Sequence, residues 1–166
     1  MSTKIKINVA DFGSMTAELY PDKAPETVKN FIKLANEGFF NGLIFHRVIR
    51  GFMIQGGGFT PEFKEKRAQS IKGEFMSNGF MSNNLRHTRG VLSMARTSAP
   101  NSASSQFFIM HMDAPHLDGA YAGFGKVIEG IEIVDMIAGV KTGSWGWYED
   151  VPKTPVVIES IEVIEE

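Results

Sequence analysis

Two short runs of residues that favour β-strands lie on either side of the dipeptide Arg50-Gly51. The first covers residues 45–49 and the second residues 52–55, and both are rich in aromatic and β-branched residues. Glycine in the connection allows the positive φ angle that a tight turn requires. The stretch predicts a β-hairpin, so a chain that contains it must build an antiparallel strand pair into its fold.

The length of the connecting loop decides which residues of this hairpin face each other. A two-residue loop would place Arg47 opposite Ile54. A three-residue loop places Arg47 opposite Gln55 and Ile49 opposite Met53. We favour the three-residue loop, because the guanidinium group then has a polar neighbour on its own face.

One face of the predicted hairpin carries Phe45, Arg47, Ile49, Met53 and Gln55. An arginine and a glutamine among large apolar side chains are not typical of a face that is buried in a core. The face can be a functional site, or the hairpin can lie at an edge with its arginine solvated. Spacing alone leaves both explanations open.

The rest of the chain contains further short β runs and two helical segments. Residues 4–9 alternate strictly between apolar and polar, which is typical of a half-buried strand. One helix is expected to begin at Pro25 and to end before Gly38, and a second to cover residues 131–138. Other strands are expected at residues 15–19, 91–96, 106–110, 124–128 and 156–164.

The order of these elements predicts a mostly β fold. Strands follow one another through hairpins and loops, and no βαβ unit repeats, which favours an antiparallel sheet over a parallel one. We predict a closed eight-stranded antiparallel β-barrel with two helices, in one domain that covers residues 1–166. Loops are expected at residues 60–69, 71–84, 97–105, 114–123 and 142–153.

Composition excludes several classes of function. A net charge of −2 gives no electrostatic support for binding nucleic acid. The absence of cysteine excludes disulfides, thiol nucleophiles and cysteine–zinc sites. No run approaches the roughly 20 apolar residues that cross a bilayer, and the first residues do not form a signal peptide. We therefore expect a cytoplasmic monomer with no nucleic-acid or membrane partner.

The motifs of several enzyme classes are also missing. The four histidines show no paired metal-ligand spacing, and no GxSxG motif indicates a serine hydrolase. His46 should lie on the opposite side of its strand from Arg47, and we interpret it as a buried, hydrogen-bonded core residue. What remains is an arginine in an apolar, aromatic setting. That setting suits a reaction that needs neither a nucleophile nor proton transfer.

Rotation about a prolyl peptide bond is such a reaction. Its barrier is about 18–20 kcal/mol, because amide resonance must be broken. The nitrogen lone pair is localised in the twisted transition state and can accept a hydrogen bond there, but not in the planar ground state. An arginine N–H at this position would therefore bind the transition state selectively.

At these residues the chain resembles the cyclophilins, a family of peptidyl-prolyl cis-trans isomerases. Residues 45–57 are similar to the family's FHR…GFM.QGG signature almost throughout. The resemblance extends essentially from end to end. It includes the first helix at 24–31, the LSMA and SQFFI segments at 92–95 and 105–109, and the LDG and FGKV segments at 117–119 and 124–127.

The resemblance implies an eight-stranded barrel capped by two helices, with no metal and no organic cofactor. It implies that Arg47 is the catalytic arginine and that proline-containing peptides and unfolded protein segments are the partners. The remaining substrate-binding residues that it implies are Phe52, Met53, Gln55, Ala95, Arg96, Gln106, Phe108, His116, Leu117 and Tyr121. The alternative is a proline-peptide binding module or chaperone-like adaptor whose isomerase activity is incidental.

The sequence differs from the best-known eukaryotic cyclophilins near the predicted pocket. Arg96 replaces a usual asparagine, His116 a usual tryptophan and Tyr121 a usual histidine, and residues 64–68 are charged where a glycine-rich turn is expected. These features resemble bacterial cytoplasmic cyclophilins. Because the tryptophan supports tight binding of cyclosporin in other members, the resemblance implies only weak cyclosporin binding here.

Overall fold

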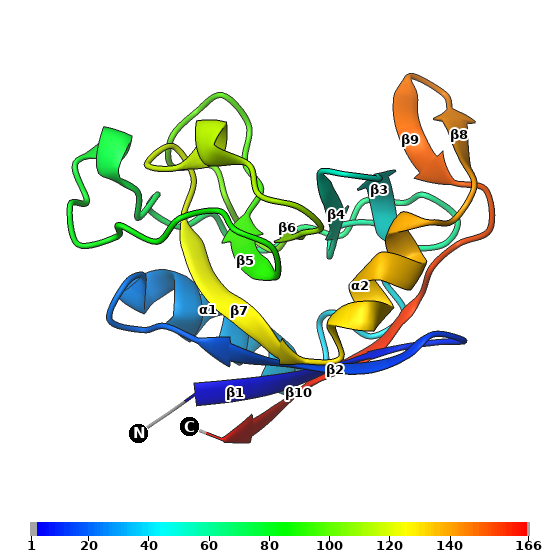
Figure 1. Ribbon diagram of the computed structural model, residues 1–166, viewed down its shortest axis with the longest axis horizontal. Coiled ribbons are helices and arrows are strands. Elements are labelled where there is room, and N and C mark those ends of the chain that lie inside the picture. The colour runs from blue at the N-terminus through cyan, green and yellow to red at the C-terminus, as the bar shows by residue number, and fades with distance from the viewer. Residues whose placement is uncertain (1–2, 166) are drawn as a thin grey trace.

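The computed structural model describes residues 3–165, and its main feature is a curled antiparallel sheet of eight strands (Figure 1). These strands are β1 (Thr3–Val9), β2 (Gly13–Leu19), β3 (Phe45–Ile49), β4 (Met53–Gly56), β5 (Val91–Met94), β6 (Phe107–Met110), β7 (Gly123–Glu129) and β10 (Ile158–Glu165). Their order across the sheet is β10-β1-β2-β7-β5-β6-β4-β3. The predicted eight-stranded antiparallel architecture is confirmed.

The two edge strands of the sheet, β3 and β10, meet through a few backbone contacts instead of a continuous ladder. Ile44 and Val157 form an isolated antiparallel bridge. On either side of it, the Phe45 N–H donates to the Val156 carbonyl at 3.0 Å, and the Ile158 N–H donates to the Leu43 carbonyl at 2.7 Å. These bonds satisfy backbone groups that an open sheet would leave unpaired at its edges.

Two helices cover the inside of the curled sheet, α1 (Pro25–Asn36) and α2 (Ile131–Ala138). The ring of Phe31 in α1 packs against Phe40, Phe107 and Phe124, with centroid separations of 4.9, 5.3 and 5.1 Å. Ile133, Val134 and Ile137 of α2 belong to the same buried cluster. Both predicted helices are confirmed, and no helix in residues 3–165 is long and apolar enough to cross a membrane.

The first turn of α1 is capped from a distant loop. Its N-cap residue, Ala24, has no side chain that can accept a hydrogen bond. The buried carboxylate of Glu74 accepts instead from the Thr27 N–H and hydroxyl, both at 2.7 Å, and from the Glu26 N–H at 3.2 Å. The predicted loop at 71–84 is therefore tied to the helix, and it holds only a short 3₁₀ turn, Met76–Asn78.

Residues 142–153, which we expected to be a loop, form a second hairpin instead. Strands β8 (Thr142–Trp145) and β9 (Tyr148–Pro152) pair with each other and project beside β3, where the chain is orange in Figure 1. Gly146 lies in the turn with a φ of 62°, and Asp150 has a φ of 61°. Most side chains of this hairpin are exposed, so it lacks the buried alternation that identifies a strand in a sequence.

Candidate active site

The β3–β4 hairpin has the register of the three-residue loop. Arg47 pairs with Gln55 and Ile49 pairs with Met53, as predicted. The alternative register, with Arg47 opposite Ile54, is wrong because Val48 holds that position. Arg47 and Gln55 consequently project from the same face of neighbouring strands.

The turn of this hairpin is held by a buried histidine. Gly51 has a φ of 82°, and the Phe52 N–H donates to the Ile49 carbonyl at 2.9 Å. The Gly51 N–H donates to Nδ1 of His111 at 2.9 Å, and Nε2 of His111 lies 3.1 Å from the carboxylate of Asp135 in α2. The turn is therefore anchored to the second helix.

Strand β6 extends the face that carries Arg47. Gln55 of β4 pairs with Phe108, and Met53 pairs with Met110. Phe108 and Met110 belong to a small cluster outside the barrel, whereas their neighbour Phe107 points into the main core. The predicted alternation along β6 is confirmed, because successive side chains of a strand point to opposite faces.

A pocket of about 130 Å³ opens on this outer face. Six of its nine lining residues are apolar or aromatic, and Phe108 and Met53 are almost fully buried there. It is lined by nine of the predicted residues: Arg47, Phe52, Met53, Gln55, Ala95, Arg96, Phe108, Leu117 and Tyr121. The other two lie beside it. Gln106 does not line the pocket, but its side-chain oxygen accepts a hydrogen bond from Nε2 of Gln55 at 3.1 Å. The ring centroid of His116 lies 5.7 Å from that of Phe52.

Arg47 is exposed at the mouth of this pocket. Its Nη1 lies 3.4 Å from Oε1 of Gln55, a long hydrogen bond, and it forms no ion pair within residues 3–165. A guanidinium group carries five N–H donors, so most of them remain available to a bound molecule. The geometry places a cationic hydrogen-bond donor directly beside an apolar cavity.

Known proteins are similar to this chain in sequence and in architecture. The family model described as cyclophilin type peptidyl-prolyl cis-trans isomerase/CLD matches residues 4–163. This chain belongs to the cyclophilin family. Among its curated relatives, peptidyl-prolyl cis-trans isomerase B of Escherichia coli is 48% identical over 92% of this chain and 95% of its own length. Peptidyl-prolyl cis-trans isomerase of Acinetobacter baylyi is 50% identical over 92% of this chain and 81% of its own length.

Solved cyclophilin structures have the same fold. A cyclophilin-type isomerase of Cryptosporidium parvum has a TM-score of 0.82 and 28% identity, and the match covers 100% of this chain and 99% of the other. Another structure of the same parasite protein, determined in the presence of the dipeptide Ala-Pro, has a TM-score of 0.80 and 29% identity over 98% and 99% of the two chains. The isomerase family and the bacterial relatives that the sequence motifs indicated are confirmed.

Arg96 is one of the residues in which this cyclophilin differs from the best-known members. Its guanidinium group lies 4.6 Å from the ring centroids of both Phe75 and Tyr121. Nη2 donates to the Ala120 carbonyl at 2.6 Å, and Nη1 donates to the Thr97 carbonyl at 3.0 Å. The arginine is therefore held between two aromatic rings and fixes Tyr121 at the side of the pocket.

The sequence analysis did not find the polar residues behind the pocket. Nδ1 of His87 lies 3.2 Å from the Asp118 carboxylate, and its Nε2 lies 2.7 Å from the hydroxyl of Ser93. Burial lowers the pKa of His87, and the hydrogen bond to Asp118 opposes that shift in part. The neutral ring stacks on Phe108 at 6.1 Å. Ser93 is fully buried, so this trio supports the pocket wall and offers no nucleophile to a ligand.

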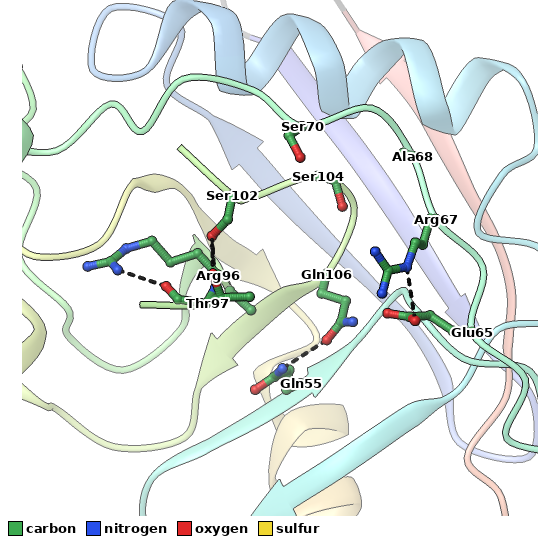
Figure 2. A pocket seen from close by; sticks show the side chains of 11 residues that line it. Gln55, Glu65, Arg67, Ala68, Ser70, Arg96, Thr97, Ser102, Ser104 and Gln106 are labelled. Atoms are coloured by element: carbon green, nitrogen blue, oxygen red, sulfur yellow. Dashed lines mark hydrogen bonds and ion pairs between the residues drawn. The ribbon is translucent and has the colours of Figure 1, made fainter. Parts of the chain in front are cut away.

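A second pocket, of about 220 Å³, adjoins the first (Figure 2). The two share Gln55, Ala95 and Arg96. The wall of the second pocket is polar, with serines of two loops on one side and an ion pair between Arg67 and Glu65, 3.0 Å apart, on the other. From the sequence we interpreted these residues as ordinary loops. The one feature that pointed to this pocket was the charged stretch at 64–68, where a glycine-rich turn is expected.

His46 is buried, as predicted, but the prediction that its side chain is hydrogen-bonded is wrong within residues 3–165. Its Nδ1 has no hydrogen-bond partner within residues 3–165. The ring instead packs against Phe59, with a centroid separation of 4.6 Å. Burial, followed by the nearby charge of Arg47, lowers the pKa of His46 to about 4. The histidine is therefore neutral at pH 7.

Proposed function

We propose that this cyclophilin speeds rotation about X-Pro peptide bonds in unfolded or flexible chains, with Arg47 stabilising the twisted amide. The observation that carries the proposal is the position of Arg47 over the apolar 130 Å³ pocket, without a carboxylate partner in residues 3–165. A pyrrolidine ring fits such a pocket because it is small, apolar and has no N–H donor. The relative determined in the presence of Ala-Pro supports the same class of ligand.

In the proposed complex, the proline ring rests on Phe52, Met53, Phe108 and Leu117. This apolar contact holds the ring while the rest of the chain turns about the C–N bond. As the amide twists, its nitrogen becomes pyramidal and its lone pair becomes available. Arg47 then donates a charge-assisted hydrogen bond that the planar ground state cannot accept, which lowers the barrier selectively.

Gln55 has a positioning role in this mechanism. It faces Arg47 across the hairpin and is itself held by Gln106, so the two amides limit where the guanidinium group can lie. Ala95 and Arg96 extend the same surface and would contact the peptide on one side of the proline, with His116 and Tyr121 at the rim. No proton is transferred and no covalent bond is broken in this scheme. The residues therefore need only hold the proline ring and donate a hydrogen bond to the amide nitrogen.

The test is substitution of Arg47 by alanine and by lysine. A charge-assisted hydrogen bond made mainly in the transition state is worth up to about 3 kcal/mol, which corresponds to roughly a hundredfold in rate. We expect Arg47→Ala to lower kcat/KM by about that factor, and Arg47→Lys to recover only part of it, because an ammonium lacks the planar fork. NMR exchange on a short X-Pro peptide measures the rate.

Arg50 provides a matched control, because it is another exposed arginine of the same hairpin and does not line the pocket. Arg50→Ala should keep the full rate, and thermal melts should show that all three variants are folded. Near-normal turnover in a folded Arg47→Ala protein would contradict the proposal. A chelator should leave the rate of the unmodified protein unchanged, because the proposed mechanism uses no metal.

The remaining expectations from the sequence stay predictions. A cytoplasmic location agrees with the cysteine-free sequence, since a chain without disulfides needs no oxidising compartment, and the monomeric state is a separate prediction. Cell fractionation and size-exclusion chromatography measure the two properties directly. The enzyme hypothesis is preferred over the adaptor hypothesis, because a pure binder gains nothing from an unpaired donor aimed at the amide nitrogen.

A further inference from the structure

A third pocket, of about 460 Å³, lies on the other side of Arg47, between β3 and the β8–β9 hairpin. We define this aromatic–acidic pocket by His46, Phe59, Trp147, Tyr148, Glu149 and Asp150. It also includes Arg47 and Gln55, which line the proline pocket as well. A peptide bound at the proline pocket therefore has a direct path into the aromatic–acidic pocket.

The aromatic side of this pocket presents an unusually open indole. Trp147 is 94% exposed, and Tyr148 beside it is 41% exposed. The other tryptophan, Trp145, has a structural contact, because it stacks on Phe63 with a centroid distance of 4.6 Å and an interplanar angle of 15°. A large aromatic ring that is left in solvent at the edge of a cavity is typical of a binding surface.

The polar side of the pocket is negative. Three carboxylates line it, those of Glu65, Glu149 and Asp150, against a single cation, Arg47. Glu65 is paired with an arginine outside the pocket and Glu149 accepts a hydrogen bond from a serine hydroxyl. The carboxylate of Asp150 has no hydrogen bond or ion pair with any residue between 3 and 165. This side of the pocket thus has unused capacity to pair with a cation.

His46 supplies a second, independent observation that a polar ligand group belongs here. Its side chain is about 95% buried, as its 5% exposure shows, and yet its Nδ1 has no partner in residues 3–165. Buried polar atoms are nearly always hydrogen-bonded, and this unpartnered one belongs to a residue that lines the pocket, so it marks a polar group that still lacks a partner there. The pKa of His46, lowered to about 4 by burial and by Arg47, keeps the ring neutral, so it does not repel a cation.

We propose that the aromatic–acidic pocket binds a lysine or arginine side chain of the substrate, near the proline that isomerises, and so gives this enzyme a preference for basic proline segments. The exposed ring of Trp147 suits a cation, which it attracts through its π system, and Tyr148 is partly exposed beside it. Glu149 and Asp150 lie on β9 and do not line the proline pocket, so a basic group paired with them would lie outside that pocket. The inference rests on the proposed function, because it places the proline in the adjoining pocket.

The first test is a set of short peptides that carry lysine, alanine or glutamate at one position, one to three residues before or after the proline. Three residues of extended chain span roughly 10 Å, so the set covers both directions in which a peptide can leave the proline pocket. We expect one position at which kcat/KM for the lysine peptide exceeds that for the glutamate peptide at least fivefold. The ratio should fall in 1 M salt, where the Debye length is about 3 Å.

The alanine peptide separates this inference from the proposed function. If it is isomerised but the lysine-to-glutamate ratio stays within twofold at every position, the inference is wrong and the proposed function stands. If no peptide of the set is isomerised faster than in buffer, the proposed function fails, and the inference fails with it.

Substitutions in the aromatic–acidic pocket test whether the preference for lysine over glutamate arises there. Trp147→Ala, Glu149→Gln and Asp150→Asn should each move the lysine-to-glutamate ratio toward one, and asparagine suits position 150 because it tolerates a positive φ. The matched controls are Trp145→Phe, on the same hairpin but outside the pocket, and Glu62→Gln, an exposed acid that does not line it. They should leave the ratio as it is. A ratio that falls equally in controls and pocket variants would overturn the assignment.

The Trp145→Phe protein also gives a direct reading of binding. The chain has two tryptophans, so this variant leaves Trp147 as its only indole. Titration with the preferred lysine peptide should change the emission of Trp147, and the matching glutamate peptide should change it far less. Equal changes with both peptides, or none with either at concentrations that saturate turnover, would show that Trp147 does not contact the basic residue.

Discussion

Replacement of Phe108 by alanine should separate substrate capture from stability, because this side chain belongs to the pocket and to a core at the same time. The ring is only 5% exposed. It stacks on His87 at 6.1 Å and meets Tyr121 edge-on at 5.8 Å. Loss of the ring therefore removes the floor of the proline pocket and two aromatic contacts together.

The size of the stability loss follows from where the cavity would open. A buried Phe→Ala change costs about 3–5 kcal/mol. One side of Phe108 already borders the 130 Å³ pocket, so the new cavity is continuous with solvent and water can enter it. We therefore expect the lower end, about 3 kcal/mol. For a domain of this size, that corresponds to a fall in Tm of roughly 6–12 °C.

Phe107 is the matched control, since it is the neighbouring phenylalanine on the same strand and points into the barrel. Phe107→Leu and Phe108→Leu should both lower Tm, but only Phe108→Leu should lower kcat/KM on a proline peptide at a temperature where both are folded. Urea melts measure the free energy of unfolding, and NMR exchange measures turnover. Equal kinetics in the two variants would mean that Phe108 does not contact the substrate.

Three further perturbations test other parts of the site. Gly58→Ala should lower kcat/KM several-fold with little loss of stability, because a Cβ there would lie 2.5 Å from Cγ of Gln106 and displace the side chain that holds Gln55; an unchanged rate would refute that role. His46→Gln should reduce the fall in the free energy of unfolding as the pH is lowered, as measured by urea melts from pH 7.5 to 5. The unfolded state gains the His46 proton near pH 6.5 and the folded state only near 4, so this residue alone should lower the free energy of unfolding of the unmodified protein by about 2 kcal/mol between pH 7.5 and 5, and an unaltered pH dependence in the variant would contradict the assignment. His116→Trp should strengthen inhibition by cyclosporin with little change in rate, because a tryptophan beside Phe52 adds apolar area and an N–H donor at the rim; equal inhibition constants would place the affinity elsewhere.

The sequence predicted those parts of the fold in which one face of an element is buried. Helix α2 has the predicted limits, and the β3–β4 register followed from requiring a polar neighbour for Arg47. In both cases a regular pattern reports which side of the element meets the core. The β8–β9 hairpin escaped prediction because most of its side chains are exposed and Gly143 and Gly146 interrupt any pattern.

Contacts between distant loops were not predictable in the same way. The cap that Glu74 provides for α1 replaces a local cap that Ala24 cannot make, and nothing near either residue indicates the other. His87 reaches Asp118 across 31 positions to support Phe108. Such pairs depend on the closed three-dimensional path of the chain, whereas propensity and spacing describe only its local geometry.

The arrangement around Arg47 combines one weakly bonded cation with a wall of well-packed side chains. Phe108 is held from behind by His87, and Tyr121 is held by Arg96, so the apolar side of the pocket has few alternative conformations. Arg47, in contrast, has one long bond to a neutral amide. A carboxylate in place of that amide would bind the guanidinium group more tightly and compete for the N–H groups that the twisted nitrogen needs. A weak neutral partner keeps Arg47 over the pocket and leaves its donors available, which is what selective binding of a transition state requires.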